Sequence, residues 1–100
     1  MVLDREEIFR VLRRYRGYLR RLGVRRIGLF GSFVRGEAGK DSDIDFIVVF
    51  EEGRKSYDSF FRLVVFLEGV FGRRVEVLTP EGISRYLKPY IEREVVYEEL

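Results

Sequence analysis

Residues 28–50 read GLFGSFVRGEAGKDSDIDFIVVF, and they carry the most informative pattern in the sequence. This stretch begins within a short apolar segment, residues 24–30, that is typical of a strand. The chain then turns at Gly31-Ser32 into one or two helical turns that end near Gly36. The run 44–50 is β-branched and aromatic and too short for a helix, so it predicts a buried strand.

A helix is expected before this stretch. Apolar residues recur at three- and four-residue steps from Ile8 to Leu22, which is typical of an amphipathic helix. Asp4, followed by Glu7 three residues later, resembles a capping box, and Gly23 stands where a glycine would end the helix.

The segments after residue 50 predict one more strand between helices. Ser56 fits the N-cap of a helix that ends at Gly72, and the alternation over 73–78 predicts a third strand. A helical tail then begins at Thr79-Pro80-Glu81, and Pro89 is expected to divide it into two short helices.

The resulting order, αβαβαβα, predicts an α/β (α+β) fold with helices on the faces of a sheet. One hundred residues make one domain, so we expect a single domain over residues 1–100. The apolar content of 46% is enough for one modest core, and the fifteen aromatic residues exclude intrinsic disorder. No segment approaches the roughly 20 apolar residues of a membrane span, and the N-terminus lacks a signal-peptide core. We therefore expect a cytoplasmic protein without membrane contact.

The composition restricts the chemistry. The chain contains neither Cys nor His, which excludes a zinc ribbon, a thiol nucleophile and the commonest general base. Any catalysis must use carboxylates, hydroxyls and Arg. Residues 1–35 carry ten arginines against three acidic residues. A solvated helix face is the favoured interpretation of this basic half, with binding of nucleic acid or an acidic partner as the alternative.

Two aspartates stand at the start of the second strand. Because side chains alternate along a strand, Asp43 and Asp45 point the same way, with Cα atoms about 6.6 Å apart. Carboxylates this close repel each other, and a divalent cation is the usual compensation. Oxygen ligands favour Mg²⁺ or Mn²⁺ over zinc. Taken alone, the pair fits a loop-and-cap role equally well, and for Asp41 that role is favoured.

The Gly31-Ser32 turn offers a second kind of chemistry. Glycine lets a backbone approach a phosphate closely, and the helix that follows offers free N–H groups to an anion. The Ser32 hydroxyl adds a donor, and Arg35 offers a positive charge one turn later. Such a pair alone is usually an ordinary turn. The informative pattern is the combination with Asp43-Ile44-Asp45, which is separated from Gly31-Ser32 by the ten residues 33–42.

Gly-Ser, ten residues and Asp-x-Asp together resemble the signature of the minimal nucleotidyltransferase (MNT) domains of the DNA polymerase β superfamily. The similarity covers nearly the whole chain and includes residues 28–37, 42–49, 75–81 and 87–97. It implies a nucleotidyltransferase fold, like the polymerase β palm, with a mixed sheet of three or more strands. Members of this group are commonly antitoxins encoded beside a HEPN-domain ribonuclease toxin.

The resemblance also implies roles for the nucleotide-binding residues. The Gly31 backbone and Ser32 would hold the β and γ phosphates of ATP. Arg35 would contact the triphosphate or, with equal weight, lie on the helix surface.

The same resemblance implies that Asp43 and Asp45 bind two Mg²⁺ ions, with Mn²⁺ possible. Glu76 on the next strand would complete the acceptor-side metal site, at a position where the family more often has Asp. The alternative for Glu76 is a solvent-facing strand residue. These three carboxylates would be both the catalytic residues and the metal ligands.

The implied function is an enzyme, a nucleotidyltransferase of EC 2.7.7 type that transfers AMP from ATP to a hydroxyl and releases pyrophosphate. By analogy the acceptor is a tyrosine of a HEPN toxin, so the chain would be an antitoxin in a heteromeric complex. The alternative is a non-catalytic antitoxin or nucleotide-binding module that inhibits the toxin by direct contact. Nucleic acid is not expected as a partner.

Overall fold

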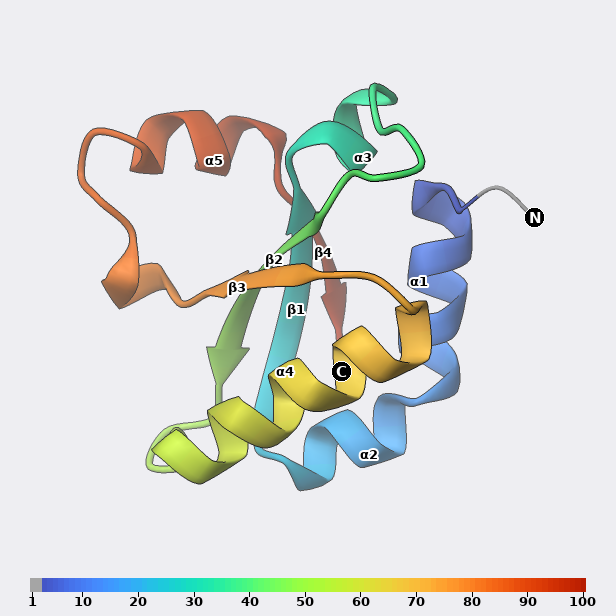
Figure 1. Cartoon of the computed structure of the whole chain (residues 1–100). Coiled ribbons are helices and arrows are strands. Elements are labelled where there is room, and N and C mark those ends of the chain that lie inside the picture. The colour runs from blue at the N-terminus through green and yellow to red at the C-terminus, as the bar shows by residue number, and fades with distance from the viewer. Residues whose placement is uncertain (1–2) are drawn as a thin grey trace.

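Four strands of the computed structural model, which describes residues 3–100, form one sheet in the order β3-β2-β1-β4 (Figure 1). In chain order the elements are α1 Arg5–Arg14, α2 Arg16–Arg21, β1 Val24–Phe30, α3 Ser32–Arg35, β2 Ile44–Phe50, α4 Tyr57–Phe71, β3 Val75–Leu78, the 3₁₀ turn η1 Pro80–Gly82, α5 Lys88–Glu94 and β4 Val96–Glu99. Residues 1–2 of the expected domain lie outside the described residues. The three strands expected from the sequence are confirmed.

The sheet is mixed, as the resemblance implies. β1 pairs antiparallel with both β2 and β4, whereas β2 and β3 pair in parallel. Phe30 lies opposite Asp45 across β1 and β2, and Asp45 lies opposite Glu76 across β2 and β3. The end of β1 and the starts of β2 and β3 therefore meet at one end of the sheet.

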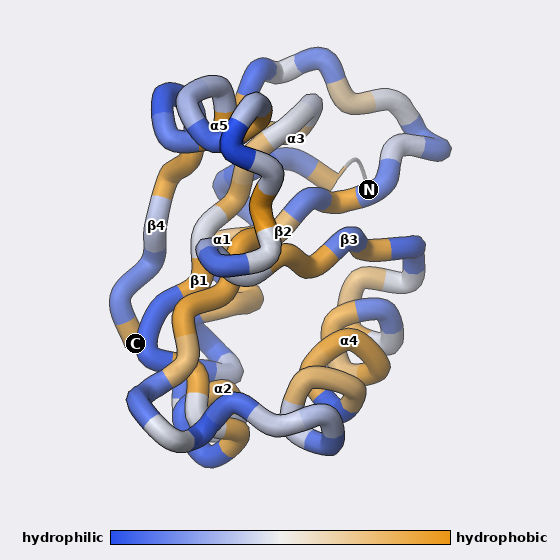
Figure 2. The backbone as a smooth tube through the Cα atoms, turned by 90° about the vertical axis from the view of Figure 1, so that its left-hand side faces the viewer, coloured by the Kyte–Doolittle hydropathy of each residue, from blue (hydrophilic) through white to orange (hydrophobic). Residues whose placement is uncertain are grey.

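The two faces of the sheet are covered by different helices. Helices α1, α2 and α4 pack on one face and α5 on the other (Figure 1). The hydrophobic colouring follows β1, β2 and α4 (Figure 2). Because side chains alternate along β2, Phe46 enters the larger core under α4, while Ile47 packs against Phe30 and Ile91. Asp45, one residue before Phe46, thus shares the α5 face with Ile47.

The helix ends follow the predicted signals. The Asp4 side chain accepts a hydrogen bond from the Glu7 N–H at 2.9 Å and caps α1. Ser56 caps α4 in a reciprocal capping box with Ser59, and α4 ends at Gly72 in the left-handed region.

The N-terminal helix is not continuous, contrary to expectation. The helix breaks at Tyr15, two residues before Gly17, a residue of low helix propensity. The break lets the rings of Tyr15 and Tyr18 pack on Phe66 of α4, with ring centroids 5.2 and 4.7 Å apart. Packing against α4 therefore outweighs the continuous helical pattern.

The tail also differs from the expected pair of helices. The expected order αβαβαβα does not include the strand β4, which is the last element of the structure. Pro89 lies in the first turn of α5, where its missing N–H leaves no helical bond unmade, so it begins a helix and does not divide one. The chain then continues as β4, which adds to the free edge of β1 with Tyr97 opposite Gly28.

Candidate active site

The two ends of the motif meet where β1 finishes and β2 begins. Gly31 directly follows β1 with a φ of +79°, a backbone conformation that favours glycine. A Cβ atom at this position would lie 3.0 Å from Asp45 Cγ and closer still to Oδ2. The pairing of Phe30 with Asp45 causes this approach, because it places Asp45 beside the residue that follows Phe30. The turn therefore lies against the second carboxylate of the motif.

The half-buried Asp45 carboxyl group faces a second carboxyl group. Glu76 stands opposite it on β3, because the parallel register aligns the two residues. Burial raises the pKa of Asp45 to about 6, and the hydrogen bond with Glu76, the Glu76 charge and the Asp43 charge act in the same direction. Arg35 lowers this pKa and only partly offsets them. Negative charge at Asp45 is poorly compensated, which favours the binding of a cation.

Asp43 lies at the edge of this pair. It precedes β2 and is exposed, although its charge acts on Asp45. Within residues 3–100, no three acidic side chains converge closely enough to form a complete set of metal ligands. The structure thus brings Asp45 and Glu76 together, whereas the Asp43 side chain lies exposed at the edge of this pair.

The donor set fits Mg²⁺ or Mn²⁺. Carboxylate oxygens are the hard ligands that these ions prefer, and the chain has no His or Cys to favour zinc. A cation beside Asp45 and Glu76 would neutralise the crowded charge that raises the pKa of Asp45.

Ser32 starts α3 directly beside Gly31. The N–H groups of Val34 and Arg35 bond back to the Gly31 carbonyl at 3.1 and 3.2 Å and close the turn. The Ser32 N–H belongs to the first helical turn, where N–H groups have no partner inside the helix. The Ser32 hydroxyl and N–H are therefore placed together at the start of α3, one residue after the glycine that lies against Asp45.

The end of α5 contributes a residue that sequence patterns do not reveal. The Glu94 carboxylate accepts a hydrogen bond from the Gly31 N–H at 2.9 Å and also binds Arg35 Nη1 at 3.0 and 3.2 Å. Arg35 Nε donates to Glu37 at 2.7 Å. The bonds to Glu37 and then to Glu94 raise the pKa of the Arg35 guanidinium above its ordinary value. Two donors that the resemblance assigns to the triphosphate are thus bound to Glu94.

The comparison with protein families identifies the class of protein to which this chain belongs. The family described as "Nucleotidyltransferase domain" matches residues 12–98, a range that holds the turn, both aspartates and Glu76. The chain belongs to this nucleotidyltransferase family. It is therefore an enzyme of the nucleotidyltransferase class, as the motif implies.

Individual relatives support the same assignment. The protein adenylyltransferase MntA of Thermococcus cleftensis is 43% identical to this nucleotidyltransferase over 97 residues, which cover 96% of this chain and 97% of MntA. A solved structure described as a candidate minimal nucleotidyltransferase has a TM-score of 0.79 and 36% identity, and the match covers 94% of this chain and 95% of that one.

A third comparison shows the fold alone. A solved complex of the tri-AMPylated Shewanella oneidensis HEPN toxin with an MNT antitoxin contains a chain with a TM-score of 0.61 and 18% identity. The match covers 88% of this nucleotidyltransferase and 69% of that chain.

The predicted site residues of the nucleotidyltransferase do not all converge to the same degree. Three of them lie in contact or in register, since Gly31 lies against Asp45 and Asp45 lies opposite Glu76, and Ser32 follows Gly31 at the start of α3. Arg35 is adjacent but paired with Glu94, and Asp43 is at the edge. No local pattern marks Glu94, because only the packing of α5 brings it to Gly31, 63 positions earlier in the chain.

Proposed function

We propose that this chain is a protein adenylyltransferase that transfers AMP from ATP to a protein hydroxyl in a reaction that requires a divalent cation and releases pyrophosphate. The observation that carries the proposal is the Asp45–Glu76 carboxylate pair, held in register directly against the Gly31-Ser32 turn. The likeness to MntA over 96% of the chain supports protein adenylylation as the specific activity. The proposed enzyme works as a single domain over residues 1–100.

Metal binding is assigned to the three carboxylates Asp43, Asp45 and Glu76. We infer two Mg²⁺ ions, for which Mn²⁺ can substitute. When bound, such a pair of ions neutralises charge on the attacking and leaving oxygens of an in-line displacement, a step that needs no histidine. Binding of both ions would require the exposed Asp43 side chain to turn inward from the edge of the site.

The remaining site residues orient the two substrates. The Ser32 hydroxyl and the N–H groups of the turn hold the β and γ phosphates of ATP, and Arg35 adds charge at the same end. Glu76 is exposed whereas Asp45 is half-buried, so the acceptor hydroxyl approaches from the side of Glu76. The Glu76 carboxylate, as a ligand of the acceptor-side cation, would assist deprotonation of that hydroxyl as it attacks the α phosphorus and displaces pyrophosphate.

We infer that the acceptor is a tyrosine of a HEPN-domain ribonuclease toxin, and that the chain acts as its antitoxin in a heteromeric complex. The fold shared with the MNT antitoxin of the AMPylated toxin complex supports this inference. Among the described helices, none has the length and apolar character needed to pass through a membrane. We place the reaction in the cytoplasm, where ATP and Mg²⁺ are available.

Mass spectrometry of the toxin tests this function. Purified toxin is mixed with the chain, with and without ATP–Mg²⁺, and the intact mass of the toxin is measured. A mass increase by whole AMP units, abolished by Asp45→Asn and by Tyr→Phe at the modified position, supports the proposal. An unchanged toxin mass, despite full binding of ATP–Mg²⁺ by the chain, contradicts it.

The exposed apolar side chains favour a second candidate, inhibition by contact. Tyr57 on α4 is 93% exposed, and Tyr86, Leu87 and Tyr90 of the tail are 73%, 55% and 67% exposed. Only part of the apolar tail is on the surface, since Ile91 is buried in the core. These side chains offer a surface for a partner without any chemistry. Inhibition of the toxin in the absence of ATP, with no change in its mass, would support this candidate.

A further inference from the structure

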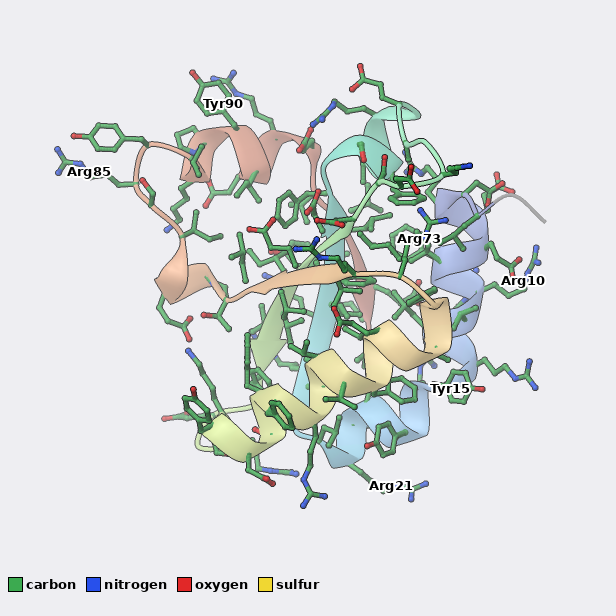
Figure 3. All side chains as sticks on the ribbon, viewed as in Figure 1. Arg10, Tyr15, Arg21, Arg73, Arg85 and Tyr90 are labelled. Atoms are coloured by element: carbon green, nitrogen blue, oxygen red, sulfur yellow. The ribbon has the colours of Figure 1, made fainter. Side chains whose placement is uncertain are left out.

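We propose that Arg73 is a positioning residue of this site. Its side chain holds the loop before β2 by hydrogen bonds and thereby determines the position of Asp43. The inference rests on the proposed function, because it assigns Asp43 to the metal-binding set. Arg73 lies between α4 and β3 and belongs to neither the turn nor the Asp-x-Asp segment. Figure 3 shows it beside the loop that leads into β2.

The guanidinium of Arg73 holds the main chain of this loop. Its Nη1 donates to the Ser42 carbonyl at 3.0 Å and reaches the Gly39 carbonyl at 3.5 Å. The loop is closed on itself as well, since the Gly39 N–H donates to Ser42 Oγ at 2.8 Å and the Ser42 N–H donates to the Gly39 carbonyl at 3.2 Å. Arg73 is therefore hydrogen-bonded to this closed loop at Ser42, the residue directly before Asp43.

The same side chain links this loop to α3. The Arg73 guanidinium lies over the Phe33 ring, 5.2 Å from its centroid, and Phe33 is 96% buried, since its exposed fraction is 4%. Phe33 directly follows Ser32, the proposed phosphate ligand. One arginine thus connects the segment that carries Ser32 with the segment that carries Asp43, across the ten residues that separate the two parts of the motif.

The backbone next to Arg73 holds Asp43 from its other side. The Ile44 N–H donates to the Arg74 carbonyl at 3.1 Å. The backbone is therefore hydrogen-bonded on both sides of Asp43. Ser42, before it, accepts from the Arg73 side chain, and Ile44, after it, donates to the Arg74 carbonyl. Residues 73–74 continue directly into β3, which carries Glu76. These hydrogen bonds therefore also fix the position of Asp43 relative to Glu76 along the sheet.

Both the shape and the charge of arginine suit this role. A planar guanidinium can donate to two carbonyls in its plane while its face lies on an aromatic ring, whereas a lysine ammonium cannot do both. The carbonyl acceptors carry no charge, and among the described residues Arg73 forms no ion pair with a carboxylate of the site. It leaves these carboxylates available to a metal.

The test compares three variants in the whole chain: Arg73→Ala, Arg73→Lys and, as a matched control, Arg74→Ala. The Arg74 side chain is exposed, and the substitution leaves its carbonyl bond to Ile44 in place. Mn²⁺ binding to the nucleotide-free chain is measured by the loss of the free-Mn²⁺ EPR signal, and the Mn²⁺ and Mg²⁺ dependence of AMP transfer is measured in parallel. Urea denaturation reports whether each variant folds.

We expect Arg73→Ala to raise the half-saturating metal concentration about tenfold or more, with transfer largely restored by excess metal. Arg73→Lys should fall between this variant and wild type, and Arg74→Ala should stay within about twofold of wild type. Hydrogen exchange at residues 39–44 should accelerate most in Arg73→Ala, less in Arg73→Lys and not in Arg74→Ala.

The proposal is overturned if Arg73→Ala and Arg74→Ala require the same metal concentration, or if Arg73→Ala lowers transfer to the same extent at every metal concentration. Should Arg73→Ala fail to fold, the comparison of Arg73→Lys with Arg74→Ala decides in the same way. Metal binding and hydrogen exchange need no acceptor. A wild-type chain that binds Mn²⁺ but transfers no AMP therefore contradicts the proposed function without affecting this comparison.

Discussion

The Asp45 carboxylate lies so close to the Gly31 backbone that no side chain fits between them. The contact joins the two parts of the motif, and it arises because Phe30 pairs with Asp45 across β1 and β2. Substitution of Gly31 therefore affects the turn and the carboxylate at once.

The variant Gly31→Ala should lose most of its AMP transfer and about 1–3 kcal/mol of unfolding free energy, because a Cβ would displace Asp45 and the φ of +79° would be strained. Gly36→Ala is the matched control. Gly36 has a similar φ of +73°, but no atom of another described segment lies within 4 Å of the added Cβ, so backbone strain of about 1 kcal/mol is the only expected effect. Urea denaturation and transfer assays measure both variants, and equal losses of transfer would contradict the steric explanation.

Neutralising Asp45 should stabilise the metal-free chain at pH 7. The folded-state pKa of about 6 lies above the ordinary value of 3.8, so between these pH values the folded state binds more protons than the unfolded state. Asp45 therefore lowers the unfolding free energy as the pH rises from about 4 to 6, and this loss is complete above pH 6. Asp45→Asn should remove it and gain about 1 kcal/mol at pH 7, since solvent screening reduces the full effect for a half-buried group.

Urea midpoints between pH 4 and 7.5 measure this difference. The control is Asp41→Asn, because Asp41 is exposed in the loop before β2. Addition of Mg²⁺ should stabilise wild type and reduce the advantage of Asp45→Asn. A metal-free Asp45→Asn chain that is less stable than wild type at pH 7 would show that the carboxylate is compensated in some other way.

Replacement of Glu76 should separate nucleotide binding from transfer. In Glu76→Gln we expect transfer to fall about 100-fold or more, because the carboxylate on the acceptor side is lost. ATP–Mg²⁺ binding should stay within about threefold, since Asp43 and Asp45 remain. Glu76→Asp should retain much of the activity with a shorter carboxylate. Calorimetry and single-turnover assays distinguish the two steps, and unchanged transfer in Glu76→Gln would remove Glu76 from the site.

Removal of the Glu94 charge should strengthen ATP binding. Glu94 engages the Gly31 N–H and Arg35, so a triphosphate must compete with it for both donors. Glu94→Gln weakens a charge-assisted interaction, which predicts an ATP–Mg²⁺ affinity about three- to tenfold higher. The control is Glu37→Gln, because Glu37 also binds Arg35 but makes no bond to Gly31. Weaker ATP binding in Glu94→Gln would mean that Glu94 maintains the shape of the turn.

Several features of the fold were predictable because they depend on residues only a few positions apart. The capping signal at Ser56 and the glycine at 72 place the ends of α4, and the apolar run 44–50 forms β2. The Gly-Ser turn likewise produces α3 and its end at Gly36. In each case the local hydrogen bonds and the local apolar pattern favour the same structure.

The tail was not predictable in this way. Val96–Glu99 is only four residues long, and it becomes a strand because the edge of β1 is free and Gly28 leaves room for Tyr97 and Val95. A Cβ at position 28 would lie 2.6 Å from Val95 Cγ2. Pro89 is compatible with either a break or a first helical turn, and the packing of Ile91 against Phe30 and Ile47 selects the second.

The chemistry of the site and the family follow from local sequence: a turn with Gly31 and Ser32, ten residues, and two aspartates in a chain without His or Cys. Tertiary structure alone decides which carboxylates are crowded together and which donors are engaged. The parallel register puts Glu76 beside Asp45, and the packing of α5 delivers Glu94 to a turn 63 positions earlier. Strand register and helix packing depend on contacts between segments that are distant in the sequence. The spacing of residues within one segment does not determine these contacts.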